Sequence, residues 1–160
     1  MRVLTIFLAV ALVSCSSSKE EAKGTLSPTE TTASPDPKAA LDQAAAEPGA
    51  IRTPSGMVYR ELTAGTGDSP RPTDVVKVNY RGTLPNGTEF DSSYKHGQAA
   101  EFPLDRVIPC WTEGVQRMKA GGKAKLTCPA NLAYGDQGSP PTIPAGATLI
   151  FEVELLGVQR

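Results

Sequence analysis

The sequence predicts an α+β domain in which one short helix packs against an antiparallel sheet, and it places this domain at residues 51–160. Three observations lead to this prediction. Several short segments alternate between apolar and polar residues, which is the period of half-buried strands. One segment, 112–119, changes to helical spacing. An Asn-Gly pair at residues 86–87, the strongest short signal for a hairpin turn, separates two of the alternating segments.

The expected strands follow one another along the chain. The first covers residues 57–62, and the second covers residues 76–81, where apolar and polar side chains alternate strictly. Phe90 begins the strand that returns from the hairpin turn. Further strands are expected at residues 123–128 and 149–155, each with one apolar and one polar face. This pattern is typical of a sheet with one side on the core and one side in water.

The helix is expected between residues 112 and 119. Trp111, Val115 and Met118 recur at positions i, i+4 and i+7, which lie on one face of a helix. The Ala-Gly-Gly sequence that follows is expected to end the helix. A long loop from residue 131 to 147 then leads to the last strand.

The first 15 residues resemble an export signal. Arg2 precedes an almost unbroken apolar run, residues 3–13, which is shorter than the about 20 residues that a membrane-spanning helix needs. The run ends in Leu-Val-Ser-Cys, similar to the lipobox of bacterial lipoproteins, in which the cysteine is acylated and becomes the new N-terminus. We therefore expect residues 1–14 to be a lipoprotein signal peptide and Cys15 to be lipidated. The alternative is an ordinary secretory signal with a chance cysteine.

Two acylated positions on one cysteine would anchor the chain stably to a membrane. Ser16 is not an aspartate, the residue that retains such lipoproteins at the inner membrane, so we expect an outer-membrane location, facing the periplasm or the cell surface. Residues 15–50 hold few large apolar side chains and are expected to form a disordered tether. An alanine-rich patch, 38–47, is helical in composition but too short to be stable alone. The tether could also serve as a binding tail.

Charge and histidine content exclude two classes of function. The formal net charge is −1, and no basic block suggests a nucleic-acid partner. The one histidine, His96, has no cysteine or carboxylate at ligand spacing beside it, so we expect a plain loop residue and no metal site.

Five groups of residues, in order and with the expected spacing, resemble the signature of the FKBP family. They cover roughly residues 52–158. The resemblance implies a twisted antiparallel sheet wrapped around one helix, in agreement with the pattern above. The segments are 78–82 (Val-Asn-Tyr-Arg-Gly), 87–93 (Gly-Thr-Glu-Phe-Asp-Ser-Ser), 107–115, 132–135 with 143–144, and 147–156.

The resemblance also implies an apolar cleft lined by aromatic side chains. Trp111 would form its floor, the Ile108 N–H and the Tyr134 hydroxyl would hold substrate carbonyls, and Asp91 would lie at the rim. Two other interpretations stay open: Trp111 as core packing only, and Asp91 as a cap of the turn that follows it. The matched catalytic positions are Tyr80, Phe90, Asp91, Trp111 and Tyr134, and the matched substrate-binding positions are Phe102, Val107, Ile108 and Phe151.

The implied activity is peptidyl-prolyl cis-trans isomerisation of exported proteins, without cofactor or metal. The implied partners are proline-containing polypeptides and FKBP-type macrolide inhibitors. A monomer is expected because the tether lacks the long helical dimerisation segment of some family members. The alternative functions are a non-catalytic chaperone or docking module of the same fold, and a purely structural lipoprotein. Three departures from the family pattern leave the preferred residue before proline open: Cys110 in place of glycine, Leu104 in place of an aromatic residue, and the loop 135–142.

Cys110 and Cys128 are expected to form a disulfide. Of three cysteines, one is assigned to lipidation, and a free pair in an exported protein tends to oxidise. A helix over 111–119 rises about 13 Å, and a strand over 123–128 returns about 20 Å, so a tight reversal between them brings the two cysteines together. Two buried free thiols are the alternative.

Overall fold

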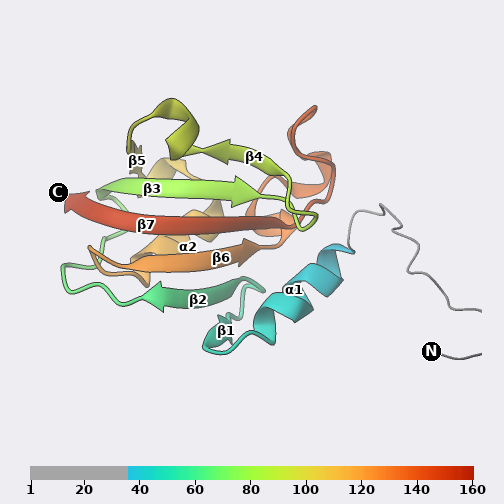
Figure 1. The fold of residues 1–160 in the computed structure, drawn as a ribbon, viewed down its shortest axis with the longest axis horizontal. Helices are drawn as coiled ribbons and strands as arrows, with labels where there is room; N and C mark the ends of the chain where they lie inside the picture. Colours follow the sequence, from blue (N-terminus) through green and yellow to red (C-terminus); the bar gives the residue numbers. More distant parts are fainter. Residues whose placement is uncertain (1–35) are drawn as a thin grey trace, which may run out of the picture. The chain divides into compact units, whose positions relative to one another are not determined.

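The computed structural model describes residues 36–160 (Figure 1). The expected signal peptide and Cys15, which is expected to be lipidated, lie outside the described residues. Within residues 36–160, no helix has both the length and the apolar character needed to cross a bilayer. The strands are β1 (Ala50–Arg52), β2 (Val58–Thr63), β3 (Val75–Thr83), β4 (Glu89–Ser92), β5 (Ala100–Pro103), β6 (Lys123–Cys128) and β7 (Leu149–Gln159). The helices are α1 (Pro37–Ala45) and α2 (Pro109–Gln116), with 3₁₀ turns η1 (Ser93–His96), η2 (Leu104–Arg106), η3 (Ala130–Leu132) and η4 (Gly135–Gln137).

The described strands form one antiparallel sheet in the order β1-β2-β6-β7-β3-β4, and β5 also pairs with β3. The two longest strands, β3 and β7, are central neighbours, paired from Val75 opposite Gln159 to Thr83 opposite Ile150. Helix α2 lies behind the sheet in the view of Figure 1, so it covers one face. The α+β prediction, one helix against an antiparallel sheet, is confirmed for the core of the domain.

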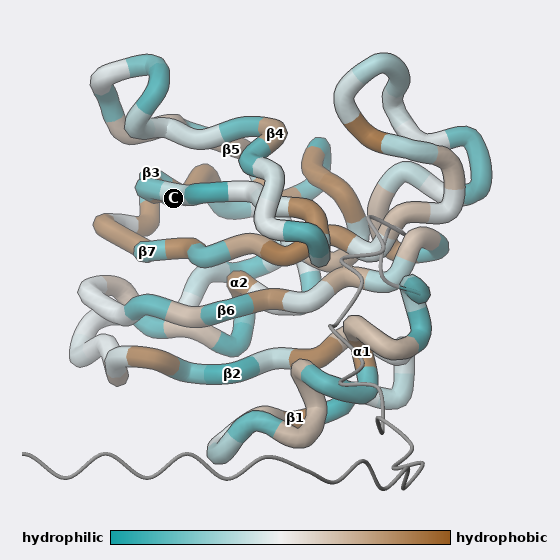
Figure 2. Tube along the Cα trace, turned by 45° about the vertical axis from the view of Figure 1, so that its right-hand side comes forward, coloured by the Kyte–Doolittle hydropathy of each residue, from teal (hydrophilic) through white to brown (hydrophobic). Residues whose placement is uncertain are grey.

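The alternation expected from the sequence decides which side chains enter the core. Val76, Val78 and Tyr80 of β3 are buried, whereas Lys77 and Arg81 between and after them are exposed. Figure 2 shows the same alternation of hydrophobic and hydrophilic residues along β7. The face toward α2 is therefore apolar, and the opposite face, called the outer face below, is polar.

Helix α2 approaches the sheet closely. Its buried residues include Trp111, Gly114 and Val115. A Cβ atom at Gly114 would lie 2.7 Å from a methyl carbon of Leu126 in β6, closer than real carbon contacts. The absence of a side chain at Gly114 thus allows the helix to pack directly on β6.

The elements match the expected ones within a few residues. The helix was expected at 112–119 and is found at 109–116, because Pro109 occupies its first turn, where proline is favoured. Met118 is buried although it lies beyond the helix end. Strands β1 and β5 have three and four residues, and neither was expected.

The prediction that the disordered tether extends to residue 50 is wrong. Residues 37–45 form helix α1, which buries Leu41 and Ala44 against Val58 of β2. Val58 and Tyr59 are consecutive, and Tyr59 belongs to the main core, so α1 packs on the outer face. The Thr148 hydroxyl also donates to the Pro37 carbonyl, at 2.9 Å. Tertiary contacts stabilise a helix that is too short to persist alone, and the folded domain therefore begins before residue 51.

The expected disulfide between Cys110 and Cys128 is present, with the two Cα atoms 5.8 Å apart. Both side chains are completely buried. The bond joins the first turn of α2 to the last residue of β6, as the opposed lengths of helix and strand predicted.

Candidate active site

An apolar cavity of about 370 Å³ lies between the inner face of the sheet and the start of α2. All nine residues that the sequence singled out line this cavity, although they come from distant parts of the chain. One further residue, Arg106, lines it as well. The lining consists of Tyr80, Phe90, Asp91, Phe102, Arg106, Val107, Ile108, Trp111, Tyr134 and Phe151.

Trp111 lies at the centre of the aromatic lining. Its ring centroid is 5.3 Å from that of Tyr80 and 5.6 Å from that of Phe102. Phe151 meets it from the other side at 5.4 Å, and all three contacts are edge to face. Such contacts are favourable for aromatic rings and restrict their movement. Trp111 is only 4% exposed, so it serves both as core packing and as the floor of the cavity.

Phe90 is positioned by a glycine on the neighbouring strand. Its ring packs edge to face on Phe151, with centroids 5.5 Å apart. A Cβ atom at Gly82 of β3 would lie 2.5 Å from the Phe90 ring and 3.0 Å from the Phe151 ring. The glycine in the motif Val-Asn-Tyr-Arg-Gly therefore makes room for the aromatic wall of the cavity.

A hydrogen bond links the polar groups at the rim. The Tyr80 hydroxyl donates to Asp91 Oδ2 at 2.7 Å, and His96 Nε2 lies 3.3 Å from Asp91 Oδ1. Burial raises the pKa of the Tyr80 hydroxyl far above its ordinary value, and the bond to the Asp91 carboxylate raises it further. Tyr80 therefore stays protonated and continues to donate to Asp91 at any physiological pH.

The structure decides the open question about Asp91. The 3₁₀ turn η1 is capped by Ser92, whose hydroxyl accepts from the Lys95 N–H at 3.3 Å. The next residue, Ser93, is buried, and its hydroxyl accepts from the Tyr80 N–H at 3.0 Å. The serines thus hold the turn, and the Asp91 carboxylate is directed to Tyr80 instead of capping the turn.

Ile108 and Tyr134, the residues expected to donate to substrate carbonyls, both line the cavity. The Ile108 carbonyl accepts from the Trp111 N–H at 2.9 Å and so starts α2, whereas the Ile108 N–H makes no hydrogen bond within the described residues. Tyr134, in the loop after β6, is 44% exposed, so its hydroxyl is open to a bound chain. The role of these two groups in holding substrate carbonyls stays a prediction.

Sequence reasoning missed two polar residues near the cavity, Arg106 and His96. Arg106 lines the cavity and is exposed, and His96, expected to be a plain loop residue, contacts Asp91. Arg106 directly precedes the matched segment that begins at Val107, and a charge next to a run of pocket residues is the signal that could have revealed it. The contact of His96 depends on the turn after β4 and left no signal in the sequence.

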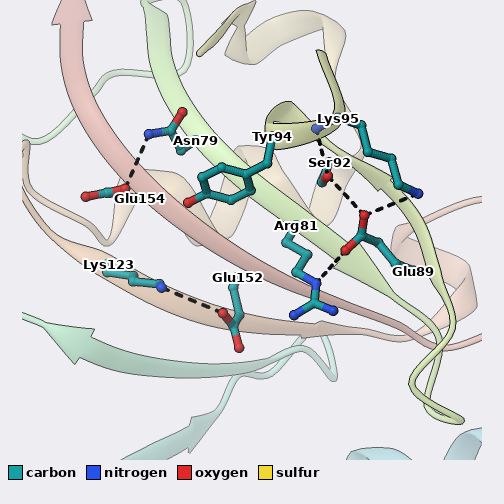
Figure 3. A pocket seen from close by; sticks show the side chains of 9 residues that line it. All are labelled: Asn79, Arg81, Glu89, Ser92, Tyr94, Lys95, Lys123, Glu152 and Glu154. Carbon is teal, nitrogen blue, oxygen red and sulfur yellow. Dashed lines mark hydrogen bonds and ion pairs between the residues drawn. The ribbon is translucent and has the colours of Figure 1, made fainter. Parts of the chain in front are cut away.

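A second hollow, of about 500 Å³, lies on the outer face of the sheet (Figure 3). Its lining is polar, and its charged side chains pair with one another. Glu89 accepts from Arg81 at 2.6 Å and pairs with Lys95 at 3.2 Å, and Lys123 lies 3.7 Å from Glu152. It offers no apolar wall against which a proline ring could pack, so the aromatic cavity is the stronger candidate site.

The described residues contain no group of three or more His, Cys, Asp or Glu side chains arranged to hold a metal ion.

Comparison with known proteins shows the family to which this chain is related. Residues 67–156 match the family model of FKBP-type peptidyl-prolyl cis-trans isomerases. The isomerase FkpA of Aeromonas hydrophila is 52% identical over 112 residues, which are 70% of this chain and 41% of FkpA. The isomerase Mip of Coxiella burnetii is 48% identical over 114 residues, which are 71% of this chain and 50% of Mip.

Solved structures show the same fold. The crystal structure of FkpA from Escherichia coli has a TM-score of 0.74 at 48% identity and covers 76% of this chain and 57% of FkpA. A peptidyl-prolyl cis-trans isomerase from Pseudomonas syringae has a TM-score of 0.72 at 37% identity and covers 77% of this chain and 90% of the other. The chain spans about half the length of the curated relatives it matches. It belongs to the family of FKBP-type peptidyl-prolyl cis-trans isomerases.

Proposed function

We propose that this chain is a peptidyl-prolyl cis-trans isomerase that accelerates rotation about X-Pro bonds in exported polypeptides. One observation carries the proposal: an aromatic cavity of about 370 Å³ that has free hydrogen-bond donors at its edge. Such a cavity accepts a proline ring and leaves the adjoining carbonyls within reach of donors.

The reaction breaks no covalent bond, so it needs no nucleophile. Rotation faces a barrier of about 18–20 kcal/mol because the planar amide is stabilised by resonance. The planar form is more polar than the twisted transition state, and an apolar cavity therefore disfavours the planar form more strongly. A cavity whose shape fits the twisted bond adds differential binding of the transition state.

Each rim group has a proposed part in this process. The Trp111 face supports the proline ring, and the Ile108 N–H and the Tyr134 hydroxyl hold substrate carbonyls on either side of it. The Tyr80 hydroxyl keeps the Asp91 carboxylate at the rim, where it can interact with the carbonyl that rotates. None of these steps moves a proton.

A proline-peptide isomerisation assay on the full chain tests the proposal. We expect activity in the wild type, and a fall in kcat/KM of tenfold or more in Trp111→Leu, which keeps an apolar side chain in the core. The rate should be nearly flat from pH 6 to 8, since the side chain of His96 is 65% exposed and an exposed pair is worth at most about 1 kcal/mol. A bell-shaped profile with an apparent pKa near 7 would contradict the mechanism.

The alternative function, a non-catalytic chaperone or docking module of the same fold, would use the cavity for binding only. The retention of Tyr80, Phe90, Trp111, Tyr134 and Phe151 favours catalysis, because binding alone does not require the full set. Suppression of aggregation of a proline-free client by a chain that is inactive on proline peptides would support the alternative. Competition by an FKBP-type macrolide should abolish isomerase activity if the cavity is the site.

We also propose that Cys15 is lipidated and that the chain is anchored at the outer membrane as a monomer. The proposal rests on the short apolar run that ends in Leu-Val-Ser-Cys and on the serine that follows. Intact-mass analysis of the membrane fraction should find a mature chain that starts at Cys15 and carries acyl chains. A different start or a missing acyl mass would refute lipidation, and light scattering of the purified chain tests the monomer.

A further inference from the structure

Resting on the proposed isomerase function, we propose that Arg106 makes this site select polypeptide segments that carry a carboxylate side chain next to the proline. Arg106 is a specificity-determining residue at the rim of the cavity. It does not take part in the bond rotation itself.

Arg106 brings the sole positive charge among the described side chains that line the aromatic cavity. Its side chain is exposed, and its guanidinium group forms no hydrogen bond or ion pair with any of residues 36–160. Arginine has five N–H donors in a planar fork that suits a carboxylate. These donors are available to a bound chain.

The backbone that carries Arg106 is held firmly. Leu104, two residues earlier in η2, is completely buried. Its N–H donates to the Asp74 carbonyl at 3.1 Å, and its carbonyl accepts from the Thr112 hydroxyl at 2.7 Å. The base of the Arg106 side chain is therefore fixed relative to α2 and Trp111, whereas the residue itself is exposed.

The nearby carboxylates do not neutralise Arg106. Asp105, its neighbour in η2, lines a different hollow on the α2 side, together with Thr112 and Glu113. Asp91 lines the same cavity, but its two oxygens face the Tyr80 hydroxyl and His96, and it forms no ion pair with Arg106. Among the described residues, the Asp91 carboxylate at the rim has hydrogen-bond partners, whereas the Arg106 guanidinium has none.

The outer face of the sheet shows the opposite arrangement. There Arg81, Lys95 and Lys123 each pair with a glutamate (Figure 3). The cations of the outer hollow have partners within the protein, whereas Arg106 has none among the described residues. An unpaired arginine beside an apolar cavity is suited to an acidic group of a ligand.

The exposure of Arg106 limits how strongly it can favour an acidic peptide. An exposed ion pair is worth enough to change an equilibrium constant by about two- to fivefold. Because the carboxylate takes no part in the bond rotation, the preference for acidic peptides should appear mainly in KM. It should also shrink as salt screens the pair.

The test uses proline peptides that differ only in having Glu, Gln or Lys directly before the proline, and a second set that differs directly after it. The full-length wild type, Arg106→Gln and Arg106→Glu are compared with Lys119→Gln, which removes an exposed charge beyond the far end of α2. We expect the wild type to prefer Glu over Lys in one of the two sets, at low salt. Arg106→Gln should abolish this preference, Arg106→Glu should reverse it, and Lys119→Gln should retain it.

Two outcomes overturn the inference: equal kcat/KM values for Glu and Lys in the wild type, or an Arg106→Gln variant that slows every peptide to the same extent. Binding of the same peptides, followed by fluorescence of the single tryptophan, Trp111, separates this failure from failure of the proposed function. A wild type that binds Glu peptides through Arg106 but isomerises none refutes the isomerase alone. A wild type that isomerises without charge preference refutes the role of Arg106 alone.

Discussion

The two faces of the sheet use neighbouring residues of the same strands for opposite purposes. In β3, Tyr80 lines the aromatic cavity and the next residue, Arg81, belongs to the outer hollow. In β7, Phe151 and Glu152 divide in the same way, and Arg81 is directly opposite Glu152 in the pairing of the two strands. One step along a strand therefore separates an apolar site from a polar surface.

The two faces differ in how their side chains interact with one another. On the outer face, opposite charges on neighbouring strands pair across the sheet, as Arg81 does with Glu89 and Lys123 with Glu152. On the inner face, rigid rings meet edge to face and cannot fill the volume between sheet and helix completely. The remaining space is the cavity, so the site follows from packing stiff aromatic groups around one short helix.

The largest expected effect comes from changing the two faces at consecutive positions. Phe151→Ala removes a buried ring that contacts both Phe90 and Trp111, and should lower the free energy of unfolding by about 3–5 kcal/mol and nearly abolish activity. Glu152→Ala removes only an exposed pair with Lys123 and should cost less than about 1 kcal/mol. Urea unfolding and the isomerase assay measure both variants. Equal losses of activity would show that the outer hollow contributes to the function.

The disulfide should support the inner face alone. It closes a loop with a sequence separation of 18 residues and connects α2 to β6, so its removal in Cys110→Ala/Cys128→Ala should destabilise the domain by about 3 kcal/mol. Because the bond fixes the helix that carries Trp111, reduction should lower activity before the domain unfolds. The double variant should not respond to reductant. Activity that is unchanged by reduction while the domain remains folded would contradict this role of the disulfide.

Tyr80 of the aromatic cavity and Tyr94 of the outer hollow form a matched pair for mutation. Tyr80→Phe leaves the Asp91 carboxylate without its buried donor, and such a bond to a charged group is worth about 1.5–3 kcal/mol. We expect a measurable loss of stability and a lower kcat/KM. Tyr94→Phe changes an exposed side chain (60%) of the outer hollow and should alter neither quantity by more than about 0.5 kcal/mol. A comparable loss in both variants would argue against a role for the Asp91 contact.

Much of the inner face could be predicted from the sequence. Strict alternation located the long strands, because burial of one face imposes a period of two. The helix was placed three residues too late, since the apolar spacing continues to Met118, which is buried from a turn and not from the helix. The nine site residues could be chosen because their spacing matched a family motif, whereas periodicity alone could not distinguish Trp111 in a cavity from Trp111 in a core.

The features that sequence reasoning missed depend on contacts between distant segments. Strand β1 is three residues long and exists because it pairs with β2. Helix α1 buries mostly alanine, so its sequence resembles that of the polar tether before it. The position of Arg106 at the rim depends on the buried Leu104 and its hydrogen bonds. Short, weakly apolar segments carry too little local information to reveal such contacts.

The smallest expected effect concerns α1 and the acid stability of the outer face. Glu47 follows α1, and its carboxylate accepts from Lys125 at 2.6 Å and from Arg60. The hydrogen bond from Lys125, supported by Arg60, lowers the pKa of Glu47 below its ordinary value of 4.5 in spite of partial burial. A folded-state pKa below the unfolded one means that the pairing adds stability above about pH 4.5 and loses it as the pH falls through the folded pKa.

Glu47→Gln should therefore be less stable than the wild type at pH 7, by up to about 1 kcal/mol, because the network is partly exposed. The difference should shrink as the pH falls through the lowered folded-state pKa of Glu47, because the wild-type carboxylate then becomes protonated. Glu61→Gln, at an exposed position of β2, is the matched control and should have the stability of the wild type at pH 7. Urea unfolding at pH 7 and at lower pH measures the stability of these variants, and the isomerase assay at pH 7 measures their activity. Loss of the α1 contact should reduce stability and leave kcat/KM unchanged, since α1 packs on the face opposite the cavity. A Glu47→Gln variant whose stability deficit stays constant as the pH falls would mean that the side chain acts through packing and not through its charge.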